Sequence, residues 1–451
     1  MKSTYLCLIL VLAFTCLGYA DIIHVPGDQP TIQAGIDAAW HGDTVLVADG
    51  TYKGNGNKNL DFKSKIIEVR SENGPEYTTI DCEGDGCGFY FQSGEGTLSV
   101  VSGFTITNGA TVTTSGGGII CNSSPTIIHN IITANLGVGG IACRKNASPV
   151  IIDNIITENA SGGVVVTVTE FGAPEITNNI IIDNRPDGIY LGNSGSANIT
   201  NNIIMNNSQN GIYCDGVSTN ITQNIIVSNG NWGIHCLDIR SSPKIINNTI
   251  SDNSGGGIRS ASYSAPTVLN TIIWGNGTQE IELSNATIYV TYSDIKGGWP
   301  GEGNIDADPL FIDPGGDFHL SDYSPCIGAG IMTPDVPNTD IDGNPRPNPP
   351  GSNPDMGASE NPLAEPPGSI DGYVTDLLEN PLTALIIAIN AETKDKYKTV
   401  TDSDGYYEIT DLEPNTYWVI CIKKGYQAGI ARVEVEPGLA TPCNFVLRRK
   451  S

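Results

Sequence analysis

Hydrophobic and polar positions recur along residues 125–293 in short runs, with a period of 22 to 25 residues. Each unit holds runs of Ile, Val and Thr, such as Thr126-Ile-Ile and Ile131-Ile-Thr, separated by Asn, Gly or Pro. Short apolar runs rich in β-branched residues predict strands, and Asn, Gly and Pro predict the turns between them. A repeat of this length with several strands per unit predicts a solenoid of stacked coils.

Two polar positions and one glycine position set the register of the repeat. The first polar position holds Asn130, Asn154, Asn179, Asn202, Asn224, Asn248, Thr271 and Ser293. The second holds Asn135, Asn159, Asn184, Asn207, Asn229, Asn253 and Asn276. The glycine position holds Gly118, Gly140, Gly163, Gly188, Gly211, Gly233 and Gly257. We expect the stacked asparagines to bond along the stack and at the bends, and Ile151, Ile156 and Val164 to point inward.

The segments on either side of the repeat carry motifs of a known superfamily. His24-Val-Pro-Gly-Asp-Gln-Pro leads to Thr31, which suits a helix N-cap, and a short helix after it would cover the open end of the solenoid. Residues 307–311, 324–326, 340–347 and 355–360 resemble the closing segment of secreted bacterial β-helix proteins. Residues 22–361 thus resemble the pectate-lyase-like superfamily, which implies an all-β, right-handed parallel β-helix with a short N-terminal capping helix. Its members include lyases, hydrolases, epimerases, adhesins and stalks, so the fold alone implies no activity.

A Pro-rich stretch at residues 362–368 predicts a linker between the β-helix domain, residues 21–361, and a second domain at 369–451. Motifs such as Ser369-Ile-Asp-Gly-Tyr and the Asp404-Gly405 turn resemble the carboxypeptidase regulatory-like domain. This resemblance implies a small transthyretin-like β-sandwich without peptidase machinery.

The N-terminus and the charge suggest where the protein works. Residues 1–20 combine Lys2, an apolar run and a small-residue end, which predicts a Sec-type signal peptide and a secreted or cell-surface protein. No second apolar stretch is long enough to span a membrane. The net charge of −26 argues against nucleic-acid partners. Residues 101–300 are nearly neutral (7 basic and 12 acidic residues, 7 − 12 = −5), so a glycan could bind there.

Nine cysteines remain outside the predicted signal peptide. Export permits disulfides, and the pairs Cys82–Cys87 and Cys421–Cys443 are the predicted ones. Two further pairs, Cys121 with Cys143 and Cys214 with Cys236, fall on adjacent coils of an inward column. Their spacing permits disulfides, but parallel Cβ directions make the torsion awkward, so buried free thiols are the other interpretation.

An outward column lies two residues after each glycine and holds the candidate site. Its residues are Ile120, Ala142, Val165, Tyr190, Tyr213, His235 and Arg259, followed by Glu282, with Asp215 on the same face as Tyr213. Aromatic rings bind sugars through their faces. A Tyr, His and Arg set could also serve β-elimination or C5-epimerisation of a uronate, with Arg259 neutralising the carboxylate and His235 or a Tyr moving the proton. An exposed structural stripe with an Arg259–Glu282 pair is the remaining interpretation.

Glu158 and Asp183 lie on adjacent coils of another outward column. They are candidate calcium ligands, the carboxylate pair of a retaining glycosidase, or an ordinary solvated turn. No cofactor is required by any motif, although calcium is possible. We therefore expect an exported protein that recognises a polysaccharide or cell-surface glycan, or that has a structural or adhesive role with other surface proteins. The alternative is a polysaccharide lyase or C5-epimerase. A monomer is expected.

Overall fold

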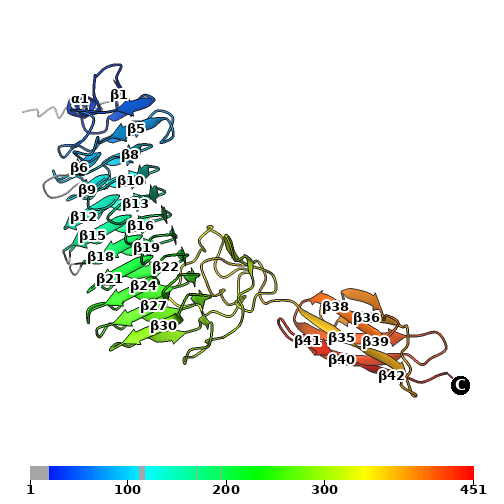
Figure 1. The fold of residues 1–451 in the computed structure, drawn as a ribbon. Helices are drawn as coiled ribbons and strands as arrows, with labels where there is room; N and C mark the ends of the chain where they lie inside the picture. Colours follow the sequence, from blue (N-terminus) through cyan, green and yellow to red (C-terminus); the bar gives the residue numbers. More distant parts are fainter. Residues whose placement is uncertain (1–19, 111–116, 170, 193–194, 451) are drawn as a thin grey trace, which may run out of the picture.

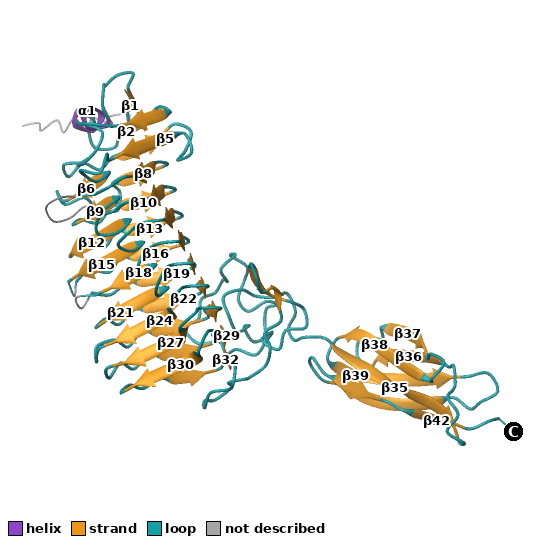
Figure 2. Ribbon diagram, viewed as in Figure 1, coloured by secondary structure: helices purple, strands orange, loops and turns teal. Residues whose placement is uncertain are grey.

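The computed structural model describes residues 20–110, 117–169, 171–192 and 195–450. Figure 1 shows a tall stack of coils, then an irregular segment lying against the lower coils, and then a separate β-sandwich that ends at the C-terminus. Figure 2 shows how little of the chain is helical. The all-β fold expected from the repeat is therefore confirmed, whereas the predicted signal peptide lies outside the described residues, apart from residue 20.

Three parallel sheets run along the stack. The first contains, in spatial order, β1 (Ile22–Val25), β2 (Thr44–Val47), β4 (Glu68–Ser71), β7 (Val100–Ser102), β10 (Thr126–Ile128), β13 (Val150–Ile152), β16 (Glu175–Thr177), β19 (Asn198–Thr200), β22 (Asn220–Thr222), β25 (Lys244–Ile246), β28 (Thr267–Leu269) and β31 (Tyr289–Thr291). The second contains β3 (Gly50–Tyr52), β5 (Thr78–Asp81), β8 (Thr105–Thr107), β11 (Ile131–Thr133), β14 (Ile155–Thr157), β17 (Ile180–Ile182), β20 (Ile203–Met205), β23 (Ile225–Val227), β26 (Thr249–Ser251), β29 (Ile272–Trp274) and β32 (Asp294–Ile295). The third contains β6 (Phe89–Phe91), β9 (Ile119–Cys121), β12 (Ile141–Lys145), β15 (Val164–Val168), β18 (Ile189–Leu191), β21 (Ile212–Asp215), β24 (Trp232–Leu237), β27 (Gly256–Ala261) and β30 (Gln279–Ser284).

The repeat aligns equivalent residues of neighbouring coils across these sheets. Ile151 pairs with Ile176 and Ile156 pairs with Ile181 in unbroken parallel register. Ile151, Ile156 and Val164 are fully buried, as the column alignment predicts. The inward-facing Ile and Val residues of successive coils form one buried cluster, so the interior is one long apolar core.

The N-terminal end of the stack is covered by helix α1 (Ile32–Ala38). Thr31 is its N-cap, and the Thr31 hydroxyl accepts a hydrogen bond from the Ala34 N–H at 3.2 Å. Ile32 and Ile36 are fully buried against the first coil. The helix therefore covers strand edges that would otherwise be open to pairing.

The asparagine ladders, which are the residues at the two polar positions of the repeat, satisfy the bends between strands. Asn179 is representative: its Nδ2 donates to Ile151 O and Thr177 O at 2.9 Å, and to Asn202 Oδ1 at 3.0 Å. The Asn179 N–H also donates to Asn202 Oδ1, at 2.9 Å. The residue before each ladder position takes a positive φ, as at Asn178 (56°), which turns the chain sharply. One left-handed residue and one buried amide therefore form each bend.

The segment after β32 closes the other end of the stack. It contains the antiparallel hairpin β33 (Phe311–Asp313) and β34 (Asp317–Leu320), followed by irregular chain. Arg346 and Glu360 are both buried, with Arg346 Nε 3.1 Å from Glu360 Oε1. Burial, followed by the charge of Glu360, raises the pKa of Asp355 to about 8. The closing segment thus packs around buried polar groups, whereas the coils pack around repeated apolar residues.

The C-terminal domain is a β-sandwich that begins at Gly368. One sheet contains β35 (Gly368–Asp376), β38 (Tyr406–Leu412), β41 (Ala440–Pro442) and β42 (Phe445–Leu447). The other contains β36 (Leu385–Asn390), β37 (Lys396–Val400), β39 (Asn415–Ile422) and β40 (Gly429–Val435). Its core packs separately from that of the β-helix. The Tyr323 hydroxyl, on the closing segment, donates a hydrogen bond to the Asp411 carboxylate of the sandwich.

Candidate functional site

The third sheet brings the predicted outward column into one line. Tyr190 pairs with Tyr213, Tyr213 with His235, and His235 with Arg259 in consecutive coils. Their side chains are partly exposed, because successive residues of a strand alternate between the core and the outer surface. Ile120 and Ala142, at the start of the column, are buried instead. The column is therefore partly exposed from Val165 onward, and its larger polar and aromatic residues follow from Tyr190.

The aromatic rings of this face are in mutual contact. The ring centroids of Tyr190 and Tyr213 lie 5.5 Å apart, and those of Tyr213 and His235 lie 4.9 Å apart. Asp215, one strand position beyond Cys214, accepts a hydrogen bond from the Tyr190 hydroxyl at 3.4 Å. Burial, followed by the charge of Asp215, raises the pKa of both tyrosines, so their hydroxyls stay protonated and available as donors.

His235 has a buried ring nitrogen, Nε2, that has no hydrogen-bond partner among the described residues. Burial, followed by the charge of Arg259, lowers the pKa of His235 to about 4. The imidazole is therefore neutral at pH 7, and one ring nitrogen can accept a proton or a hydrogen bond.

Arg259 already has protein partners. Its Nε lies 3.2 Å from Glu282 Oε1, within ion-pair distance but without hydrogen-bond geometry. The guanidinium carbon also lies 5.9 Å from the centroid of the Trp232 ring. Trp232 is buried beside Gly256, where a Cβ would overlap the indole ring. The sequence analysis did not identify Trp232. The feature that could have indicated it is Gly256, the residue that pairs with Trp232 in the next coil.

A shallow cavity of about 430 Å³ adjoins the face at the C-terminal ends of its strands. Its lining residues are Asp215, Leu237, Asp238, Ile239, Ser262 and Tyr263. Tyr263 has a φ of 69° and is 70% exposed, which is an unusual backbone conformation for a bulky residue. This part of the site lies in irregular turns, outside the repeated columns, so the repeat could not predict it.

The two candidate calcium ligands remain a pair of carboxylates at a turn. Glu158 and Asp183 have φ of 56° and 58° and line an open cavity of about 550 Å³ together with Arg185. Within the described residues, no group of three or more His, Cys, Asp or Glu side chains is placed to hold a metal ion. Calcium at this position therefore stays a prediction.

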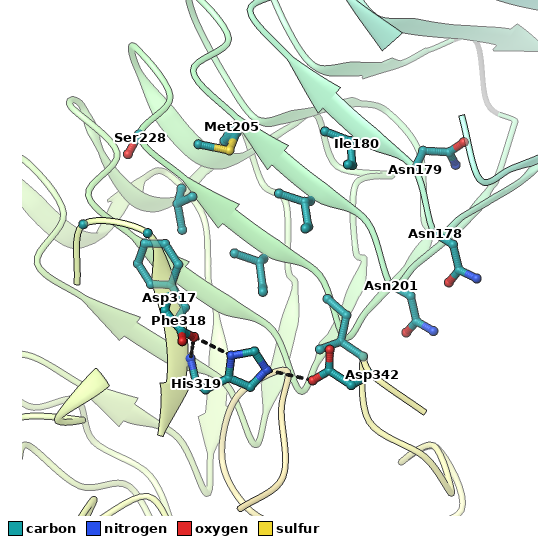
Figure 3. A pocket seen from close by; sticks show the side chains of 16 residues that line it. Asn178, Asn179, Ile180, Asn201, Met205, Ser228, Asp317, Phe318, His319 and Asp342 are labelled. Carbon is teal, nitrogen blue, oxygen red and sulfur yellow. Dashed lines mark hydrogen bonds and ion pairs between the residues drawn. The ribbon is translucent and has the colours of Figure 1, made fainter. Parts of the chain in front are cut away.

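A further cavity, of about 470 Å³, lies where the closing segment packs against the outer face of the second sheet. Ile180, Met205 and Phe318 supply apolar walls, and His319 stands at one side between two carboxylates (Figure 3). His319 Nε2 lies 2.8 Å from Asp342, and its Nδ1 contacts Asp317. Partial burial lowers the pKa of His319, but the hydrogen bonds to the two carboxylates outweigh it, so the pKa is raised.

The predicted disulfides are not formed. Cys82, Cys87, Cys421 and Cys443 are all buried free thiols. The Cys87 thiol instead donates to Asn59 Oδ1 at 3.5 Å, and burial raises the pKa of Cys421 to about 11. The stacked pairs are free thiols too, at residues 121, 143, 214 and 236. A buried thiol packs as a small apolar group, which suits each of these core positions.

Comparisons with known proteins agree with this architecture. Residues 80–276 match the family described as periplasmic copper-binding protein (NosD), and residues 369–448 match the carboxypeptidase regulatory-like domain. The structure of pectate lyase Pel9A is similar with a TM-score of 0.52 and 17% identity, covering 76% of this chain and 97% of that one. The chain is a parallel β-helix protein with a carboxypeptidase regulatory-like domain.

Two further solved structures are similar to this β-helix protein at lower TM-scores. The periplasmic alginate epimerase AlgG has a TM-score of 0.36 at 14% identity, over 55% of this chain and 77% of that one. The mannuronan C-5 epimerase AlgE4 A-module of Azotobacter vinelandii has a TM-score of 0.35 at 16% identity, over 61% and 95%. No curated protein sequence matches the chain. Within the described residues, no helix is long and apolar enough to cross a membrane.

Proposed function

We propose that this β-helix protein is exported and binds a polysaccharide or cell-surface glycan on the outer face of its third sheet. The observation that carries the proposal is the stacked, partly exposed set Tyr190, Tyr213 and His235. Pyranose rings carry apolar C–H faces that pack on aromatic rings, and hydroxyls that hydrogen-bond to polar groups beside them. The neighbouring cavity at Asp215 and Tyr263 extends the same surface.

The charges near the stack favour a neutral glycan over a polyuronate. Asp215, Asp238 and Glu282 place three carboxylates beside the face, against the two cations Arg259 and Arg240, the second of which lies 3.9 Å from Asp238. Arg259 is held by Glu282 and Trp232, so its charge is largely neutralised before a ligand arrives. A glycan carboxylate would therefore meet net negative charge, whereas neutral hydroxyls would find acceptors.

A second candidate function, a polysaccharide lyase or C5-epimerase, is favoured by His235 alone. Its imidazole is neutral at pH 7, as a general base for the C5 proton of a uronate requires, and its Nε2 has no partner among the described residues. That nitrogen is buried, so it would have to be uncovered before it could reach the proton. Arg259 would have to leave Glu282 to neutralise the uronate carboxylate. Because breaking the Arg259–Glu282 ion pair costs free energy, we favour glycan binding over catalysis.

A retention assay on glycans decides between these functions. The mature chain, residues 21–451, would be tested on a panel of neutral and uronate polysaccharides, with and without Ca²⁺, and any released products analysed by chromatography. We expect retention on a neutral glycan, reduced about fivefold or more by Tyr213→Ala, because aromatic packing contributes roughly 1–3 kcal/mol. Tyr289→Ala is the matched control, since Tyr289 is 65% exposed on the first sheet.

The possible results are distinct. Retention that is lost in Tyr213→Ala and kept in Tyr289→Ala supports the binding face. Products that disappear in His235→Ala and Arg259→Ala would establish the enzyme instead. Retention that is unchanged in Tyr213→Ala rules out this face as the site.

A further inference from the structure

The end of the β-sandwich farthest from the β-helix has an unusual surface. Three segments meet there, residues 377–379, 423–426 and 448–450, which we call the distal tip. Asp376 pairs with Leu447, Tyr426 forms a bridge with Arg449, and the Lys450 N–H donates to Gly425 O at 2.9 Å. Figure 1 places the C-terminus at this far end. The tip is therefore one continuous surface, built from residues remote in sequence.

Two adjacent leucines project from the tip without cover. Leu377 is 63% exposed and Leu378 is 82% exposed. The turn that carries them is ordered, because Asp376 Oδ1 accepts hydrogen bonds from the N–H groups of Leu378 (2.8 Å) and Asn380 (3.0 Å). The backbone N–H groups of Leu378 and Asn380 are hydrogen-bonded within the turn, whereas the two leucine side chains remain exposed. Exposed apolar groups of this kind mark an interaction surface.

Positive charge gathers at the same end. The domain from residue 369 on contains nine basic residues, and five of them lie in the tip: Lys423, Lys424, Arg448, Arg449 and Lys450. Within the described residues, none of these five forms an ion pair with a carboxylate within 4.0 Å. Lys423 donates to the backbone at Thr383 O, and Arg449 stacks 5.8 Å from the Tyr426 ring. Asp376 and Glu379 bring two carboxylates to the same end, so the five cations outnumber them there in a chain whose net charge is −26.

We propose that the distal tip docks on a lipid bilayer rich in anionic headgroups. Leu377 and Leu378 enter the interfacial region, while the five cations contact the headgroups, since Lys and Arg near a negative surface strengthen such binding. A second copy of the chain is disfavoured, because two tips would bring five cations against five. An anionic polysaccharide would offer the leucines no apolar medium. The acidic β-helix is repelled by the same bilayer, which orients the molecule tip first.

Vesicle co-sedimentation of the mature chain tests this docking. We expect sedimentation with vesicles of phosphatidylcholine and phosphatidylglycerol in equal parts, about tenfold or more above vesicles of phosphatidylcholine alone, and weakening as salt rises. The triple change Arg448→Gln, Arg449→Gln and Lys450→Gln should reduce partitioning about a hundredfold. The double change Leu377→Ser and Leu378→Ser should reduce it about tenfold or more.

Matched controls lie at the other end of the same domain. Leu439 is 55% exposed, and Gly438 beside it bonds to Pro366 at the linker, so Leu439→Ser should partition like the parent. Lys396→Gln with Lys398→Gln should also change little, because Lys396 pairs with Ile389 near the proximal end of β36 and Lys398 pairs with Ile387 in its middle. Equal sedimentation with neutral vesicles, or parent-like partitioning of both tip variants, overturns the proposal. The salt titration of the unaltered protein tests the docking even if a variant misfolds, because sedimentation that does not weaken with salt contradicts it.

Discussion

The asparagine ladders and the outer aromatic column are made by the same stacking and yet differ in almost every physical property. The ladder residues are fully or almost fully buried and nearly identical from coil to coil, and they hydrogen-bond along the stack. The outer column changes residue at each step, from Val165 through Tyr190 and His235 to Arg259, and stays partly exposed. A repeated, buried column thus holds the coils together, whereas a column whose residues differ from coil to coil presents individual side chains at the surface.

Removing one ladder amide should have the largest effect on stability. In Asn202→Ala, Ile176 O and Thr200 O each lose a hydrogen bond, and so do the amides of Asn179 and Asn224. Each unsatisfied buried group costs about 1–3 kcal/mol, so we expect a loss of about 4 kcal/mol in the free energy of unfolding. Denaturant unfolding would measure it.

Asn198→Ala is the control from the same coil. Asn198 is exposed, and its Oδ1 accepts one hydrogen bond, from Asn220 Nδ2 at 3.0 Å. We expect a change below about 0.5 kcal/mol. Similar losses in both variants would show that the ladder contributes no more than a surface asparagine.

The sequence predicted the repeat, its N-terminal cap and the C-terminal domain, and it missed the irregular chain that lines the cavities. The spacing of Asn154 and Asn179 placed the ladders, and the spacing of Tyr190, Tyr213 and His235 placed the face in register, because parallel strands fix equivalent residues at one coil per step. The Tyr263 turn and the His319 cavity escaped prediction, because they depend on irregular chain. The proposed disulfides were wrong because cysteines close in space or sequence also suit a core as apolar thiols.

Acid should reveal the cost of holding His235 neutral. Its pKa is lowered from 6.5 to about 4 in the fold, so the folded protein binds fewer protons than the unfolded chain between these values. The associated stability is present above about pH 6.5 and is lost as pH falls through 4. We expect a loss of about 2 kcal/mol, less than the full shift would give because the side chain is partly exposed. His235→Gln should flatten this part of the stability profile, measured by denaturant unfolding at each pH. An equally steep profile in the variant would assign the loss to other groups.

Making the outer column uniform should separate stability from recognition. Tyr213→Val restores the residue type found at Val165, and a β-branched residue suits an outward strand position. Losing the ring contacts with Tyr190 and His235 should cost about 1 kcal/mol or less. Glycan retention should nevertheless fall as it does in Tyr213→Ala. A loss of several kcal/mol in unfolding would instead place this column with the ladders, as structure.

Extending the ladder should give the smallest effect, with the opposite sign. Thr271 interrupts the first ladder, where its hydroxyl accepts from the Asn248 N–H at 3.3 Å and donates to Leu269 O at 3.0 Å. In Thr271→Asn, the new carbonyl could also accept from Asn248 Nδ2, so we expect a gain of about 0.5 kcal/mol. Thr267→Asn, at an exposed position of the same coil, should give no gain. If Thr271→Asn destabilises the protein, the asparagine side chain does not fit at this position. Available space, rather than hydrogen bonding, would then explain why the run of asparagines stops at Asn248.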